Sequence, residues 1–336
     1  MSFLRFRMYQ ELTKFHLLDL PSVAIRHVIR TMDLNAMFFF SLTSRKAKSI
    51  LNYSLPKNYF HVKYSFLNDK FFVIGSPNQR LFIATHLYLF RRYKLVHFFH
   101  RVQGIMYKMF DCNNDIQIIW DEPFQDGMEI LMTHFAESFH IPKISMEFGC
   151  NIDPKTSLAL LNHAKSLNAP LMKVEMRLHY LPIEIYKAFL DEGPRIIQKL
   201  VIAPQNAPDF QYRPSEVFKL DNLRISHGHW VHLEDFMECK HVIVKNMTKH
   251  PNRYYADSKK LNDFFKLWKA SSCRLENLEL DVHYIRDLSF EEITADLDGT
   301  NFIHTNVYQS VEIQRANGIK ARILMSTIYL ILEVFD

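Results

Sequence analysis

The stretch from residue 15 to residue 51 constrains the fold more than any other, because its apolar side chains recur at helical spacing. Four of them follow the i, i+3, i+4 and i+7 pattern of one helix face: Ile25, Val28, Ile29 and Met32. Pro21 suits the first turn of this helix, where its missing N–H is not needed. A segment of about 40 residues buries too little surface to be stable alone. The block therefore needs the rest of its chain, or a partner protein, to cover its apolar side.

Two further helices are predicted in the same block. Asp33 or Asn35 can accept the free N–H groups in the first turn of a second helix. This second helix is apolar almost all round, through Met37, Phe38, Phe39, Phe40 and Leu42. Ser44 offers a cap for a third, basic helix. From these residues alone, the block is either an ordinary helical subdomain packed on its own chain or a module that docks on another protein.

The ordered residues of this block resemble an F-box, the module that connects a substrate receptor to a cullin–RING ubiquitin ligase through a Skp-type adaptor. The matching residues are Leu20-Pro21, Ile25, Val28, Ile29, Met32, Asp33, Met37, Ser41-Leu42 and Ser44-Arg45. Val23 stands where an acidic residue is common in the broad F-box pattern. The basic third helix at residues 44–48 is similar to that of the large nematode F-box group.

The resemblance implies a substrate-recognition adaptor of a Skp–cullin–F-box type ubiquitin ligase. The first two helices are then expected to dock on a Skp-type adaptor, and through it on a cullin–RING ligase. The adaptor-binding residues implied by the resemblance are Leu20, Pro21, Ile25, Val28, Ile29, Met32 and Met37. The C-terminal part of the chain is expected to bind a protein substrate, which the sequence does not identify.

The rest of the chain is expected to be a globular, reduced protein. Its 336 residues are 48% hydrophobic and include 28 Phe, which allows a sizeable core and two or three units. The net charge of +5 is mild and spread along the chain, so it does not by itself indicate a nucleic-acid-binding protein. Four widely separated Cys predict reduced core thiols. With no signal-peptide pattern and no membrane-spanning run, we expect a cytoplasmic or nuclear protein without membrane association.

The chain after the helical block is predicted to be α/β, of mixed α+β type. A β meander is expected over residues 59–89, because aromatic and β-branched runs alternate with turn residues. Residues 91–109 are expected to be irregular or helical. From residue 113 onwards short apolar strands alternate with helical stretches, which predicts parallel strands with right-handed crossovers. The expected strands are residues 116–120, 144–148, 172–176, 198–202, 222–226, 241–245 and 275–281.

The strand spacing of roughly 25–30 residues is within the range of leucine-rich repeats. Leu275, Leu278 and Leu280 have the L-x-x-L-x-L spacing of such a repeat. The repeats differ in length, so we predict an irregular, leucine-rich-repeat-like α/β solenoid, with an ordinary layered α/β domain as the alternative. Asn317-Gly318 predicts a C-terminal β-hairpin with a type I′ turn.

A second resemblance covers roughly residues 220–325, which are similar to the F-box-associated domain of the nematode F-box group. The matching positions are Trp230, Leu233, Glu234, Asp235, Phe236, Phe264, Trp268, Leu275, Glu276, Leu278, Leu280, Asp281, Arg315, Gly318 and Ala321. Together the two resemblances predict an F-box at residues 13–54, a β-rich connecting region at 58–112 and an F-box-associated, leucine-rich-repeat-like domain at 113–336.

No pattern in the sequence predicts catalysis, a metal site or a cofactor. The eight Gly form no phosphate-binding loop. The close histidine pairs, His97 with His100 and His227 with His229, lack further ligands at metal spacing. We therefore expect a non-enzymatic adaptor. Two alternatives remain: a stand-alone protein-interaction module whose helical block packs on its own chain, and a nucleic-acid-binding protein.

Overall fold

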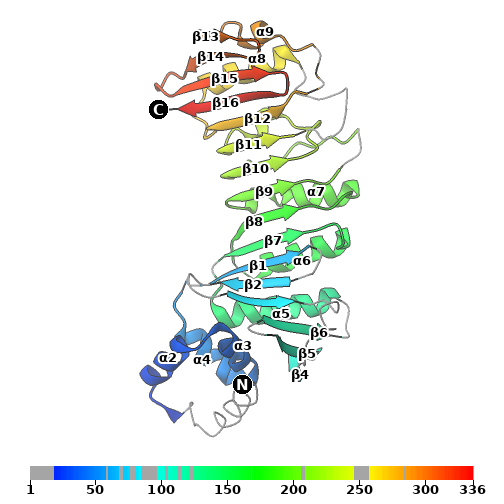
Figure 1. The fold of residues 1–336 in the computed structure, drawn as a ribbon, viewed down its shortest axis with the longest axis vertical. Coiled ribbons are helices and arrows are strands. Elements are labelled where there is room, and N and C mark those ends of the chain that lie inside the picture. Colours follow the sequence, from blue (N-terminus) through cyan, green and yellow to red (C-terminus); the bar gives the residue numbers. More distant parts are fainter. Residues whose placement is uncertain are drawn as a thin grey trace. The chain divides into compact units, whose positions relative to one another are not determined.

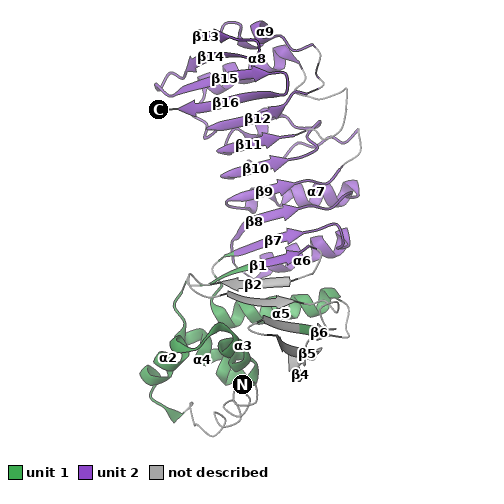
Figure 2. Cartoon of the chain, in the orientation of Figure 1, with its two compact units in different colours: residues 1–62, 71–143 green, residues 63–70, 144–336 purple. Residues whose placement is uncertain are grey.

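The computed structural model describes residues 19–335, except 58–59, 68–70, 76–79, 85–96, 103–104, 113–114, 121–123, 142, 168, 206–208, 246–256, 284 and 286. For the strands between residues 71 and 120 it describes the backbone, with the side chain of Ile118. The chain divides into two compact units (Figure 2). Unit 1 comprises Met1–Val62 with Phe71–Lys143, and unit 2 comprises Lys63–Lys70 with Ile144–Asp336. The three domains expected at 13–54, 58–112 and 113–336 do not coincide with these units.

Unit 1 starts with three short helices, drawn in blue in Figure 1. They are α2 (Ser22–Thr31), α3 (Leu34–Thr43) and α4 (Arg45–Ser54), and together we call them the helical block. The predicted helix starts are confirmed by their caps. Asp33 Oδ1 accepts a hydrogen bond from the Ala36 N–H at 2.7 Å, and Ser44 Oγ accepts one from the Ala47 N–H at 3.0 Å.

A sheet and a long helix complete unit 1. The strands are β2 (Phe71–Gly75), β3 (Arg80–Ala84), β4 (His97–Val102), β5 (Ile105–Cys112) and β6 (Asp115–Trp120), and the helix is α5 (Phe124–Phe139). The strands lie in the order β2-β3-β6-β5-β4, with β3 and β6 parallel and the other neighbours antiparallel. The expectation that residues 91–109 are irregular or helical is wrong for the part described, because β4 and β5 pair with each other there. The apolar residues of this segment follow neither a helical nor a strand period, so its secondary structure depends on pairing with a neighbouring strand.

Unit 2 is built on a sheet whose central strands are parallel. In Figure 1 its strands follow one another in the order β13-β14-β15-β16-β12-β11-β10-β9-β8-β7-β1. The parallel strands are β7 (Ile144–Phe148), β8 (Leu171–Met176), β9 (Lys199–Ile202), β10 (Asn222–Ile225), β11 (His241–Val244) and β12 (Asn277–Asp281). These confirm the strands expected from residue 144 onwards. Strand β1 (His61–Phe66) begins in unit 1 and ends in unit 2.

Helices cover one face of this sheet and leave the other face open (Figure 1). They are α6 (Pro154–Ser166), α7 (Ile183–Asp191), η3 (Gly193–Arg195), η4 (Leu233–Phe236), α8 (Ser258–Ala270) and α9 (Phe290–Thr294). One ladder of side chains under the helices is almost fully buried and runs across the parallel strands: Met146, Val174, Leu200, Leu223, Val242 and Leu278. Because strand side chains alternate between faces, the residues next to this ladder lie on the open face.

The C-terminal end of unit 2 is antiparallel. Its strands are β13 (Thr300–His304), β14 (Tyr308–Gln314), β15 (Lys320–Ser326) and β16 (Tyr329–Phe335), and β16 pairs with β12. The predicted hairpin is confirmed as β14 and β15, but the type I′ turn is wrong. In that turn only Gly318 has a positive φ, of 90°, whereas a type I′ turn needs positive φ at both central residues. The Arg315 N–H bonds to the Ile319 carbonyl at 2.9 Å, which leaves three residues in the loop instead of two.

Candidate docking surface on the helical block

An apolar stripe runs along α2 and the residues that flank it, with side chains that recur every four residues. Its members, which we call the α2 stripe, are all half-buried: Leu20, Ala24, Val28 and Met32. A spacing of four residues keeps neighbouring members on one side of a helix. Beside them Pro21 is exposed, and Val23 is 79% exposed. The stripe and these two residues form an apolar surface that the described part of the chain leaves partly open.

Three residues expected at the adaptor contact lie inside the helical block. Ile25 is 9% exposed, Ile29 is fully buried and Met37 is 5% exposed. They are buried where α2 and α3 pack on α4, whose Ala47 and Leu51 are also buried. These three residues therefore hold the block together. The other four expected residues are the half-buried Leu20, Val28 and Met32 and the exposed Pro21.

The helical block is anchored on α5 through aromatic side chains. Phe38 of α3 is fully buried and stacks on Phe135 with ring centroids 5.4 Å apart. Beside this pair, Ser41 Oγ lies 2.8 Å from His134 Nε2 in a buried hydrogen bond. The sequences of α3 and α5 did not predict this contact. The spacing of apolar residues shows that a helix has an apolar face, but not which other element packs against it. The partner of that side is set by the tertiary fold.

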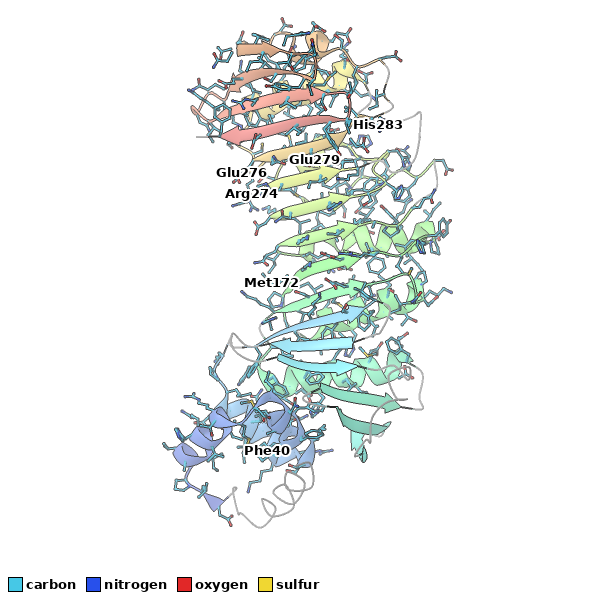
Figure 3. The ribbon with its side chains drawn as sticks, in the orientation of Figure 1. Phe40, Met172, Arg274, Glu276, Glu279 and His283 are labelled. Carbon is cyan, nitrogen blue, oxygen red and sulfur yellow. The ribbon has the colours of Figure 1, made fainter. Side chains whose placement is uncertain are left out.

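Polar contacts at the edge of the same interface join α4 to α5. Lys48 forms an ion pair with the Glu137 carboxylate, and Asn52 Nδ2 donates a hydrogen bond to the Glu137 carbonyl at 2.8 Å. Phe40, on α3 and labelled in Figure 3, is only half-buried. The block thus uses α3 and α4 to bind its own chain, while the α2 stripe remains partly open.

The positions that resemble an F-box-associated domain serve mainly to hold unit 2 together. Trp268 is fully buried and donates from Nε1 to the Leu275 carbonyl at 3.1 Å. The Arg315 guanidinium lies 3.9 Å from the centre of the Trp268 ring and donates to the Cys273 carbonyl at 2.9 Å. This arrangement joins the antiparallel end of the sheet to α8 and the start of β12.

A concave site of about 410 Å³ lies next to these positions in unit 2. Its lining includes Glu234, Asp235 and Leu267. Burial raises the pKa of Asp235 to about 6, although the charge of Arg213 opposes this shift. Arg213 bridges the two carboxylates, at 3.1 Å from Glu234 and 3.0 Å from Asp235. The acidic lining is thereby partly neutralised by the chain itself.

Within the described residues, no group of three or more His, Cys, Asp or Glu side chains is placed to hold a metal ion. His227 and His229 form no such group, and the side chains of His97 and His100 lie outside the described part. Across the same described segments, none of the helices has the length and apolarity needed to cross a bilayer.

Comparison with known families identifies two regions of the chain. The model of the F-box domain matches residues 17–59, and the model described as F-box associated matches residues 214–280. Neither the curated proteins nor the solved structures gave a match. The chain therefore carries an F-box domain and an F-box-associated domain, as the two resemblances predicted. Both are interaction modules, and they support a role in substrate recognition for a ubiquitin ligase of the Skp–cullin–F-box type.

Proposed function

Because the chain carries an F-box domain and an F-box-associated domain, we propose that it is a substrate receptor of a Skp–cullin–F-box ubiquitin ligase. In this proposal the helical block docks on a Skp-type adaptor, and unit 2 binds a protein substrate. Ubiquitin transfer takes place on a separate enzyme, to which this chain brings the substrate close. Such a receptor acts in the cytoplasm or the nucleus.

The observation that carries the proposal is the open α2 stripe. Exposed apolar patches on a folded protein mark interaction sites. Here Val28 of α2 and Met32 just after it are half-buried, whereas Ile25 and Ile29 of α2 are buried. Since a few apolar anchors dominate the energy of most interfaces, we expect Leu20, Val28 and Met32 to contribute most to adaptor binding.

The packing of α3 and α4 on α5 supports the same role. It holds the helical block in a defined conformation before any partner binds, which lowers the ordering cost of association. Ile25, Ile29 and Met37 act indirectly in this proposal, because their burial positions the stripe.

The test is direct binding between the purified full-length chain and a Skp-type adaptor, measured by isothermal titration calorimetry. Truncation of two anchors, in Leu20→Ala/Val28→Ala, is expected to weaken binding by about tenfold or more. Ile50→Ala is the control, since Ile50 is an equally half-buried aliphatic residue on α4. It should leave the affinity within about twofold.

Two outcomes would contradict docking through this surface. One is the absence of adaptor binding by the wild-type chain. The other is an equal loss of adaptor affinity in Ile50→Ala and in the double variant, when circular dichroism shows that all the proteins are folded. The first outcome would favour a stand-alone interaction module, whose helical block serves only to pack on α5.

A further inference from the structure

The open face of the unit 2 sheet carries an organised set of charges. These residues, which we call the charged patch, are Lys63, Glu147, Lys173, Glu175, Arg177 and Lys199. Lys173 is in register with Lys199, and Glu147 with Glu175. Glu147, Lys173, Glu175 and Lys199 alternate with the buried ladder, so they lie on the face that the helices leave open. Lys63 and Arg177 belong to the patch through their ion pairs with these glutamates.

Glu175 is the centre of the patch. Its Oε1 lies 2.8 Å from Lys173 Nζ and 3.2 Å from Lys199 Nζ. Its Oε2 accepts a hydrogen bond from Arg177 Nη2 at 2.7 Å. One carboxylate thus holds three cations from two neighbouring strands and the residue that follows β8.

Glu147 extends the network to β1. It lies 2.9 Å from Lys63 Nζ and 3.4 Å from Lys173 Nζ, and it accepts a hydrogen bond from Ser65 Oγ at 3.2 Å. Lys173 therefore bridges the two carboxylates. The cations are held in place by the side chains beneath them.

In the charged patch the acidic side chains are buried and the basic side chains are exposed to solvent. The side chains of Glu147 and Glu175 are 7% and 3% exposed, whereas those of the four cations range from 31% for Lys173 to 58% for Arg177. Four positive and two negative charges leave an excess of two positive charges, and this excess faces solvent. Arg224, exposed on the adjacent β10, adds a further cation to the same face.

Further along the same face, charges of both signs are mixed and paired. Glu279 on β12, labelled in Figure 3, is paired with Lys245, and Glu333 on β16 lies opposite Arg322, which is paired with Glu312 on β14. The positive excess is therefore confined to the part of the face formed by β1 and β7 to β10. A partner of negative charge would be directed to that part.

We propose that the charged patch binds an acidic segment of a substrate protein, rich in Asp and Glu side chains. This inference rests on the proposed function, in which unit 2 recognises the substrate. The carboxylates of the segment would form charge-assisted hydrogen bonds with the exposed ends of Lys63, Lys173, Lys199 and Arg177. The buried glutamates restrain these cations in advance, which reduces the side-chain entropy lost on binding.

The interleaved glutamates favour a peptide over a nucleic acid as the partner. A nucleic-acid site gathers cations along a continuous surface to match closely spaced phosphates. Here the neighbouring cations of the patch have a carboxylate between them, and the charges a few strands away are mixed in sign. A flexible acidic segment can place its carboxylates at the separate cations.

The test is binding of the full-length chain to a fluorescein-labelled peptide of repeated Glu-Gly, followed by fluorescence anisotropy. Lys173→Gln/Lys199→Gln is expected to weaken binding by about tenfold. The control is Lys245→Gln/Lys266→Gln, which removes the same charge from two ion-paired lysines elsewhere in unit 2. It should change the affinity by no more than about twofold.

A second variant covers the case in which loss of both lysines unfolds the protein. Arg177→Gln removes the most exposed cation and leaves Glu175 paired with Lys173 and Lys199. It is expected to weaken peptide binding by about threefold to tenfold. Absence of saturable binding, or equal losses in the control and patch variants, would overturn the proposal. Tighter binding to single-stranded RNA or to vesicles containing phosphatidylserine would also overturn it.

The same variants separate this inference from the proposed function. The patch variants are expected to bind the Skp-type adaptor with wild-type affinity, because they leave the α2 stripe unchanged. If the wild-type chain binds the acidic peptide through the patch but fails to bind the adaptor, the ligase role is refuted and the peptide site stands. If the wild-type chain binds the adaptor but not the acidic peptide, only the peptide site is refuted.

Discussion

At the scale of single residues, Glu175 shows how a carboxylate remains ionised in a nearly buried position. Burial favours the neutral acid and would raise its pKa. Hydrogen bonds from Lys173 and Arg177, with the nearby charge of Lys173, instead lower the pKa to about 2. The group is therefore charged throughout the neutral range, and the geometry of the patch does not change with pH there.

This lowered pKa gives a stability prediction for Glu175→Gln. In an unfolded chain a glutamate has a pKa of about 4.3, so ionisation of Glu175 stabilises the fold fully above that pH and progressively less as the pH falls towards 2. At pH 7 the variant should be less stable by about 2 kcal/mol, the value of a hydrogen bond to a charged group. The difference from wild type in urea unfolding should narrow as the pH falls from about 5 towards 2.

The control for this prediction is Glu279→Gln, which alters a partly exposed carboxylate paired with Lys245. Its effect at pH 7 should be below about 1 kcal/mol. If the difference in free energy of unfolding between wild type and Glu175→Gln stayed constant over the whole pH range, the charge of Glu175 would not contribute to stability.

At the scale of secondary-structure elements, α5 serves as the base of the helical block. Four buried aromatic residues meet there, with Phe38 stacked on Phe135 and Phe60 packed edge-on against Phe139 at 5.6 Å between ring centroids. A short three-helix unit has too small a core of its own, and this additional helix supplies the missing apolar surface.

Removal of one ring from this interface should therefore destabilise unit 1. Phe38→Ala is expected to lower the free energy of unfolding by about 3–5 kcal/mol, because it leaves a cavity in packed surroundings. The matched control is Phe40→Ala on the same helix, where the ring is half-buried and the loss should be below about 2 kcal/mol. Guanidinium unfolding monitored by circular dichroism gives both values. Equal losses in the two variants would contradict the role of α5 as the base.

At the scale of the whole molecule, the two proposed binding surfaces belong to different compact units. The α2 stripe lies in unit 1 and the charged patch in unit 2. Sites without shared partners usually make additive contributions, within about 0.5 kcal/mol. A receptor built in this way can change its substrate without changing its attachment to the ligase.

We therefore expect the two binding events to be independent. The dissociation constant for the acidic peptide should change by less than about twofold when the Skp-type adaptor is saturating. The measurement is the anisotropy titration repeated with and without adaptor. Leu20→Ala/Val28→Ala is the control, at an adaptor concentration that saturates the wild type but leaves most of this variant unbound. A larger shift in the wild type alone would reveal coupling between the surfaces.

Local patterns predicted the features that depend on neighbouring residues. Asp33 and Ser44 cap their helices as expected, because a cap bonds to an N–H three residues away. The prediction failed at residues 97–102 and 105–109, where strand pairing decided the structure, and at Asn317, where an additional loop residue replaced the type I′ turn. The roles expected for the seven adaptor-binding residues stay predictions. The structure separates them into those that are buried and those that are partly open.

Local patterns along the chain were enough to predict where α3 and α4 begin, where the parallel strands of unit 2 lie and which two interaction modules the chain carries. Capping, side-chain alternation and helical periodicity act over a few residues, so they can be identified along the chain. Packing in three dimensions was needed to show that α5 supports the helical block, that Ile25 and Ile29 are buried while Val28 is partly open, and that Glu175 joins cations from β8 and β9. Those features depend on strand register and on packing between residues far apart in the chain, which no local pattern specifies.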